Sequence, residues 1–168
     1  MPEKMVVRQN NSFQTLFWYA DTDEQPDQSL ELVEGLHELT PYGMMLASLA
    51  SCTAIVMHTY AQAHHIHLHE VELRASYDRT YRTDCTDCED EAAFEEEIVL
   101  EILVVDDLSA RDRKRLLRAA ELCPIHKILQ HGTSVDVKLL DPGTPPTPIE
   151  HDEQHHHHHD QHEHSSHE

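Results

Sequence analysis

The chain has 168 residues, of which 26% are charged, 39% hydrophobic and 5% aromatic. Its formal net charge of −20 argues against nucleic acid and anionic membrane surfaces as partners, because both repel an acidic protein. The N-terminal sequence MPEKMVVRQNNS lacks the apolar region of a signal peptide, so we expect a cytoplasmic protein. In that compartment the four cysteines are expected to be redox-active or metal-bound, not structural disulfides.

The composition changes near Leu140. Residues 1–140 are long enough to bury a core, and we predict a single folded domain there. Residues 141–168 begin with a proline-rich linker and continue into a tail of His, Asp and Glu, which contains nine of the 17 histidines. Because this segment has almost no apolar surface to bury, we predict that it is disordered.

Strand patterns flank a long apolar segment. Residues 13–19 (FQTLFWY) and 29–36 precede it, and residues 70–81 and 94–105 follow it with clear alternation of apolar and polar side chains. Such alternation is typical of half-buried strands, and the last two are expected to form a long antiparallel hairpin. A final strand is predicted at residues 134–139.

The apolar segment, residues 41–63 (PYGMMLASLASCTAIVMHTYAQA), contains no Asp, Glu, Lys or Arg. Pro41 suits the first turn of a helix and Thr40 suits its N-cap. Small polar residues interrupt the apolar run, which argues against a membrane span: Ser48, Ser51, Cys52 and Thr53. A helix that is apolar nearly all round is buried on all sides, so we predict a central buried helix.

Two further helices are predicted after the hairpin. Ser109 suits the N-cap of the first, which has the basic outer face RDRKRLLR. Its inner face is expected to hold Leu116, Leu117 and Ala120. Pro124 begins a short helix that extends to residue 130 and is closed by Gly132. Helices combined with strands joined as hairpins indicate an α+β domain.

Two cysteines far apart in the sequence are candidates for chemistry. Cys52 lies in the middle of the central helix, and Cys123 directly precedes the short helix in the sequence ELCPIHKIL. At a helix N-cap, unpaired N–H groups and the helix dipole favour a thiolate. However, free cysteines are also common as small buried residues, so these patterns alone leave a structural role equally open.

Three segments resemble the OsmC/Ohr family of osmotically inducible and organic hydroperoxide resistance proteins: PYGMMLASLASCTAIVMHTYAQAHHIHLHEVELRASYDR, FEEEIVLEI and CPIHKIL. The resemblance covers residues 13–139. It implies an OsmC-like α+β fold in which antiparallel sheets surround long central helices of an intertwined homodimer. It also implies that Cys52 is the peroxidatic cysteine, that Cys123 is the resolving cysteine and that Arg8 is the thiolate-stabilising arginine. Positions where family members usually carry a carboxylate hold Tyr42 and Gly43.

The activity that the resemblance implies is that of a thiol peroxidase in the response to oxidative stress. It would reduce organic hydroperoxides or hydrogen peroxide through a disulfide cycle between Cys52 and Cys123. This cycle needs a hydroperoxide substrate and a thiol reductant, and requires no cofactor.

Metal binding is the alternative function. Cys85 and Cys88 form a CxxC motif that is half of a zinc site, a redox dithiol or incidental. Five consecutive histidines in the tail suit Zn or Ni: His155, His156, His157, His158 and His159. These features favour a non-enzymatic metal-binding or metal-buffering protein.

Two smaller points remain open in the sequence. One is a third function, a binding module for a small apolar ligand in which Cys52 is buried and inert. The other is a histidine cluster after the central helix, which we expect at surface positions: His64, His65, His67 and His69.

Overall fold

The computed structural model describes residues 3–21, 29–81, 94–139 and 145. Contacts within the chain separate two units, Met1–Thr133 and Ser134–Glu168. The strand predicted at residues 134–139 is wrong. This segment has no regular structure, and its apolar side chains, Val135, Val137 and Leu139, are exposed. An alternating pattern becomes a strand only where a neighbouring strand accepts its hydrogen bonds.

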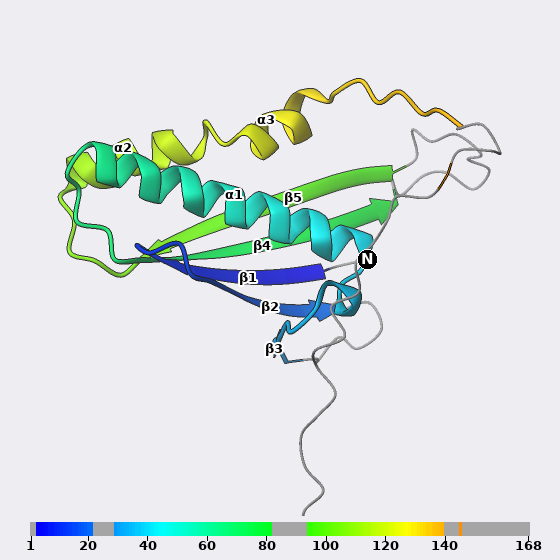
Figure 1. Ribbon diagram of the computed structural model, residues 1–168, viewed down its shortest axis with the longest axis horizontal. Coiled ribbons are helices and arrows are strands. Elements are labelled where there is room, and N and C mark those ends of the chain that lie inside the picture. The colour runs from blue at the N-terminus through cyan, green and yellow to red at the C-terminus, as the bar shows by residue number, and fades with distance from the viewer. Residues whose placement is uncertain (1–2, 22–28, 82–93, 140–144, 146–168) are drawn as a thin grey trace, which may run out of the picture. The chain divides into compact units, whose positions relative to one another are not determined.

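Five strands of the first unit form one antiparallel sheet in the order β3-β2-β1-β4-β5 (Figure 1). They are β1 (Glu3–Asn10), β2 (Thr15–Asp21), β3 (Glu31–Leu32), β4 (Glu70–Tyr81) and β5 (Phe94–Val104). The predicted long hairpin is confirmed, since β4 and β5 pair from Val71–Val104 to Tyr81–Phe94.

The centre of the sheet is the part that the sequence patterns missed. β1 pairs with β2 on one side and with β4 on the other, although no strand was predicted there. In contrast, the strand expected at residues 29–36 is present only as the two residues of β3. It is followed by a short 3-10 helix, Leu36–Glu38.

Three helices accompany the sheet: α1 (Pro41–Ala63), α2 (Ala110–Ala120) and α3 (Pro124–His131). α1 packs across β1 and β4, and α2 and α3 pack against α1 (Figure 1). Both predicted N-caps are confirmed. Thr40 Oγ1 accepts a hydrogen bond from the Gly43 amide at 3.0 Å, and Ser109 Oγ accepts one from the Asp112 amide at 3.1 Å.

The core lies between α1 and one face of the sheet. Met5 and Val7 of β1 and Leu73 of β4 are completely buried against Leu46 and Met57 of α1. The alternate side chains of β1 and β4 point to the other face. An antiparallel sheet with only one covered face produces this alternation of apolar and polar residues.

Within one chain, α1 is buried on the side that faces the sheet and partly exposed on the other side. Met44 is 40% exposed and Ile55 is 46% exposed, and both lie on the helix face turned away from the sheet. On α2 the predicted inner face is partly wrong, because Leu116 is buried but Leu117 is 53% exposed.

α1 is long and apolar enough to cross a membrane by length and composition alone. However, 50% of its most apolar window is buried inside the protein. Core helices of globular domains have the same character, and the packing of α1 against β1 and β4 fits this interpretation.

Candidate functional site

The structure brings Cys52 and Cys123 together. Cys52 lies half-buried in the middle of α1, and Cys123 is fully buried at the N-cap of α3. The two thiols are close enough for the Cys123 thiol to influence the pKa of Cys52, and both cysteines are free. Because α1 packs against both α2 and α3, residues distant in the sequence meet at one point of the helix layer.

The environment of Cys52 raises its pKa above the usual thiol value. Burial is the main cause, and the hydrogen bond with the Cys123 thiol acts in the same direction because it favours the protonated form. The backbone N–H of Ile125 opposes these effects by donating to the Cys52 sulfur. The protonated thiol of Cys52 therefore dominates at neutral pH.

This arrangement modifies the role expected for the N-terminus of α3. The sequence correctly predicted Cys123 at the N-cap, but its side chain makes no hydrogen bond with the helix it caps. Instead, Ile125, in the first turn of α3, donates to Cys52. An unpaired N–H group at the start of α3 therefore stabilises the Cys52 sulfur, which belongs to a different helix, α1.

Exposure distinguishes the two thiols. Cys123 has no accessible surface, whereas Cys52 is partly accessible. A reagent that approaches from solvent therefore meets Cys52 first. This difference in exposure fits a sequence in which Cys52 reacts first with the reagent and Cys123 then reacts with Cys52.

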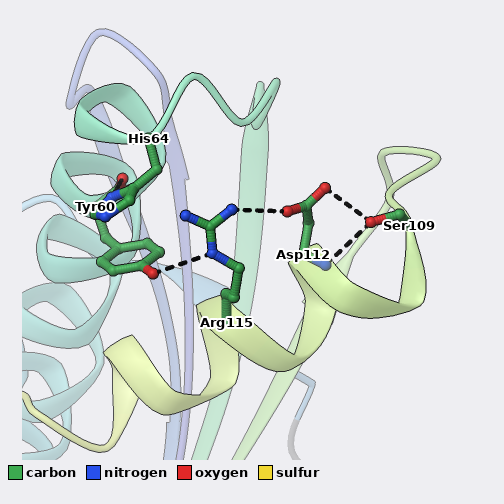
Figure 2. A network of polar contacts seen from close by, with 5 residues as sticks. All are labelled: Tyr60, His64, Ser109, Asp112 and Arg115. Carbon is green, nitrogen blue, oxygen red and sulfur yellow. Dashed lines mark hydrogen bonds and ion pairs between the residues drawn. The ribbon is translucent and has the colours of Figure 1, made fainter.

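A polar network fixes the neighbouring ends of α1 and α2 (Figure 2). Arg115 Nε donates to the Tyr60 hydroxyl at 3.2 Å, and its guanidinium carbon lies 5.6 Å from the centroid of the same ring. Arg115 Nη1 also lies 3.2 Å from Asp112 Oδ1, while the Asp112 carboxylate accepts from Ser109 Oγ at 2.8 Å. The Tyr60 ring stacks on His64 at 3.9 Å between centroids.

Arg8 is not brought to the cysteine pair within the chain. It lies on β1 between the buried Val7 and Gln9, so its side chain points to the sheet face opposite α1. There its Nε donates to Glu72 Oε2 at 2.6 Å, and its guanidinium carbon lies 5.3 Å from the Trp18 ring centroid. The described contacts of Arg8 are therefore those of an outer-face ion pair.

A buried carboxylate does lie at the N-terminus of α1, but it comes from β1. Glu3 is 4% exposed and accepts hydrogen bonds from Thr40 Oγ1 at 2.7 Å and from the Tyr19 hydroxyl at 3.0 Å. A Cβ at position 43 would lie 2.8 Å from a Tyr19 ring carbon, so Gly43 makes room for this contact. Glu3 was not predicted from the sequence, although it lies two residues before Met5 and four before Val7, the spacing of one strand face.

The candidate metal ligands of the CxxC motif and the tail lie outside the described residues. They are Cys85, Cys88, His155, His156, His157, His158 and His159. Among the residues that the structure does describe, no group of three or more His, Cys, Asp or Glu side chains is arranged to hold a metal ion.

The histidine cluster after α1 lies at the surface, as predicted. His64, His65, His67 and His69 are all exposed. His69 Nδ1 lies 2.6 Å from Asp106 Oδ1, and the His69 amide donates to Asp106 Oδ2 at 2.9 Å. This contact joins the start of β4 to the segment after β5, which is a structural role.

Comparisons with known proteins agree with this architecture. The family model described as OsmC-like protein matches residues 34–138. An OsmC-like hydroperoxide resistance protein from Jannaschia sp. CCS1 has a similar solved structure, with a TM-score of 0.56 and 14% sequence identity. The similarity covers 85% of this chain and 96% of that one, and it supports the α+β fold.

A second solved structure is an organic hydroperoxide resistance protein OsmC from Legionella pneumophila. Its TM-score is 0.44 at 13% identity, over 70% of this chain and 82% of that one. No curated protein sequence matches the chain.

Proposed function

Since the chain belongs to the OsmC-like protein family, we propose that it is a thiol peroxidase that reduces hydroperoxides. The contact between the thiols of Cys52 and Cys123 carries this proposal, because a two-cysteine redox cycle needs two sulfurs that can bond. The Jannaschia protein of the same fold is described as a hydroperoxide resistance protein, which supports a peroxide as the substrate.

In the first step the Cys52 thiolate attacks one oxygen of the hydroperoxide. The O–O bond breaks, the alkoxide takes a proton and leaves as an alcohol, and Cys52 becomes a sulfenic acid. The peroxide is reduced by two electrons that Cys52 loses. Cys52 is the attacking residue because it is the accessible member of the pair.

In the second step the Cys123 sulfur attacks the Cys52 sulfur. A disulfide forms, and the sulfenic hydroxyl leaves as water with the proton of the Cys123 thiol. An external dithiol then returns two electrons and two protons and restores both thiols. The closeness of the two thiols favours this step, because a disulfide forms only between sulfurs that can approach to bonding distance.

The raised pKa of Cys52 limits the first step at neutral pH. Only the thiolate is the nucleophile, and burial keeps its fraction below that of a free cysteine. The Ile125 N–H provides the opposing stabilisation of the thiolate. With Arg8 engaged by Glu72 on the other sheet face, a donor from α3 is the described group that assists Cys52.

The active form that we propose is a homodimer. The outer face of α1 exposes Met44 and Ile55, and Cys52 lies between them on the same helix. Apolar side chains gathered on one helix face mark an interaction surface. A second copy placed there would cover α1 and enclose the half-exposed Cys52 thiol.

A second candidate function is the binding of divalent metal by the tail. The five consecutive histidines and the surrounding carboxylates favour it, because imidazoles are ligands for Zn and Ni. This activity requires no contribution from Cys52 or Cys123, so both functions can belong to one chain.

The peroxidase proposal is tested by measuring dithiol-dependent consumption of cumene hydroperoxide by the full-length protein. We expect Cys52→Ser to abolish turnover, because a hydroxyl does not ionise near neutral pH. Cys123→Ser is expected to complete one oxidation and then stall, with Cys52 over-oxidised at excess peroxide.

The matched control is the double variant Cys85→Ser/Cys88→Ser, which removes two thiols outside the pair and should retain most of the activity. Absence of turnover by the wild type with any dithiol would reject the proposal. Normal turnover by Cys123→Ser would reject only the resolving role and assign that step to an external thiol.

A further inference from the structure

The face of the sheet opposite α1 carries a cavity of about 570 Å³. Its floor includes Val6 and Arg8 of β1 and Arg74 of β4. These residues alternate along their strands with residues that are completely buried in the core, such as Met5 and Leu73, so their side chains point to the outer face. The volume falls within the range of small-molecule sites in proteins, about 300–1,000 Å³.

Two arginines meet over one carboxylate at this cavity. Glu72 Oε2 accepts a hydrogen bond from Arg8 Nε at 2.6 Å, and Glu72 Oε1 accepts one from Arg74 Nε at 2.8 Å. Burial would raise the pKa of Glu72, but the hydrogen bonds from Arg74 and Arg8 outweigh it and lower the pKa, so Glu72 is ionised. Its side chain is only 8% exposed, and it therefore anchors both guanidinium groups from below.

The two arginines retain hydrogen-bonding capacity toward the cavity. Each guanidinium has five N–H donors, whereas the carboxylate of Glu72 offers only two oxygens. The side chains of Arg8 and Arg74 are 51% and 56% exposed, so both can be reached from solvent. A carboxylate matches these groups because it accepts two parallel N–H bonds from one planar guanidinium.

The charge of the lining favours a ligand with a single negative charge. Three cationic side chains, Lys4, Arg8 and Arg74, line the cavity together with two carboxylates, Glu72 and Glu101. The lining therefore has an excess of one positive charge, although the whole chain has a formal charge of −20. A monoanion would balance this excess, whereas a second negative charge would face only carboxylates.

An apolar wall adjoins the charged floor. Trp18 of β2 is paired with Val6, which is itself paired with Arg74, so the indole lies in the same row across the sheet. The guanidinium carbon of Arg8 lies 5.3 Å from the Trp18 ring centroid, which holds the ring beside the positive charges. Leu30 also lines the cavity and is 43% exposed. An apolar ligand body would cover this exposed surface.

We propose that this cavity binds a small monocarboxylate, whose carboxylate pairs with the two arginines and whose apolar body packs against Trp18. The site lies beyond the proposed peroxidase function and does not rest on it, because neither Cys52 nor Cys123 lines the cavity. It also lies on the other side of the sheet from α1, whose outer face is the proposed dimer surface. The volume and the single excess charge favour a small molecule over an acidic protein segment.

The test uses tryptophan fluorescence, because Trp18 is the one tryptophan of the chain and lines the cavity. The full-length protein is titrated with 4-phenylbutyrate, 4-phenyl-1-butanol and 4-phenylbutylamine, which share an apolar body and differ in charge. We expect a saturable change with 4-phenylbutyrate and at least about tenfold weaker binding of the alcohol and the amine. Isothermal titration calorimetry is expected to give about one 4-phenylbutyrate per chain.

Each outcome of these titrations decides one part of the proposal. Equal affinities for the three probes would overturn the argument from charge. Absence of saturable 4-phenylbutyrate binding in both measurements would overturn the site. Cys52→Ser is expected to bind 4-phenylbutyrate as the wild type does, and loss of binding in this variant would overturn the independence from the redox cycle.

A matched pair of arginine variants tests the charge. Arg74→Gln removes one cation from the lining, whereas Arg118→Gln removes an exposed arginine of α2 that does not line the cavity. We expect Arg74→Gln to weaken 4-phenylbutyrate binding about five- to tenfold and Arg118→Gln to retain it. Equal binding by the two variants would overturn the role of the arginine pair.

A second pair applies if Arg74→Gln does not fold, as judged by circular dichroism. Ser76→Phe places a large side chain in the cavity, whereas Ser12→Phe makes the same substitution in the exposed turn between β1 and β2. Loss of 4-phenylbutyrate binding in Ser76→Phe alone would support the site. Equal binding by the two serine variants would overturn its location.

Discussion

Arg115 contacts Tyr60 at equal sequence distances from the two cysteines. Tyr60 follows Cys52 by eight residues, and Arg115 precedes Cys123 by eight residues. The two segments therefore run antiparallel, with a polar contact at one end and the thiol pair at the other. The Cys123 amide donates to the Ala120 carbonyl at 3.0 Å, so the position of Cys123 follows that of the last residue of α2. We therefore predict that Arg115 positions Cys123 relative to Cys52.

We predict that Arg115→Met lowers the equilibrium constant for forming the Cys52–Cys123 disulfide against glutathione by about two- to fivefold. The physical reason is that α2 loses its contact with the Tyr60 ring and hydroxyl. Tyr60→Phe keeps the ring and is expected to show a smaller loss. The measurement is quantification of oxidised and reduced protein in glutathione buffers.

The control for this prediction is Arg118→Met, which removes an exposed arginine from the same helix. It is expected to leave the equilibrium constant unchanged. Thermal unfolding of the reduced proteins separates positioning from a general loss of stability. Equal constants for Arg115→Met and Arg118→Met would show that the contact does not position Cys123.

A second prediction concerns the pH dependence of Cys52. Because burial raises its pKa, the thiolate fraction at neutral pH is smaller than that of a free thiol and grows about tenfold per pH unit. We expect the rate of its alkylation by iodoacetamide to level off at a higher pH than that of a single cysteine in a short unstructured peptide. Mass spectrometry of the peptide that contains Cys52 gives the rate.

The variant Cys123→Ala separates the two causes of the raised pKa of Cys52, which are burial and the neighbouring thiol. It removes the influence of the neighbouring thiol but leaves the partial burial of Cys52 largely unchanged, so we expect the pKa of Cys52 to decrease only in part. If the alkylation rate of Cys52 levelled off at a lower pH than that of the free thiol, the result would contradict the raised pKa of Cys52.

Local sequence patterns predicted most of the elements, because caps and alternation act over a few residues. Thr40, Ser109 and Pro124 marked helix starts that the structure confirms, and alternation predicted β4 and β5. β1 was missed and residues 134–139 were wrongly assigned for one reason. Whether a short alternating segment becomes a strand depends on partners from distant parts of the chain.

The site was less predictable than the fold. The roles of Cys52 and Cys123 came from the family resemblance, and their contact depends on the packing of α1 against α2 and α3. Arg115 could not be selected from the run RDRKRLLR, where several basic residues look alike. Its contact with Tyr60 depends on how α1 and α2 pack against each other, which no short sequence pattern encodes.

The third prediction concerns the tail. Truncation after Leu140 is expected to remove most Ni²⁺ binding, because His155–His159 are lost together with the other histidines of the tail. Binding by the full chain should weaken as the pH falls through about 6.5, since protonated imidazole does not ligate metal. Calorimetric titration with Ni²⁺ measures both effects.

Thermal unfolding and peroxide consumption are the controls for the truncation, and both are expected to change little. The strand-forming and helical residues that the structure describes all precede the cut. If the truncated protein takes up as much metal as the full chain, the tail is not the site, and Cys85 and Cys88 become the next candidates.

The last prediction tests the homodimer. Ile55 on the outer face of α1 is 46% exposed, and Val99 on the outward-facing side of β5 is 44% exposed, so the two residues are matched in burial within one chain. We expect Ile55→Glu to dissociate the dimer, because enclosing a carboxylate among apolar side chains costs several kcal/mol, whereas Val99→Glu remains dimeric. Light scattering should give twice the chain mass of 19.4 kDa for the wild type and Val99→Glu, and the single-chain mass for Ile55→Glu at micromolar concentration. A wild type that scatters as one chain would reject the dimer, and two variants that both stay dimeric would place the interface away from α1.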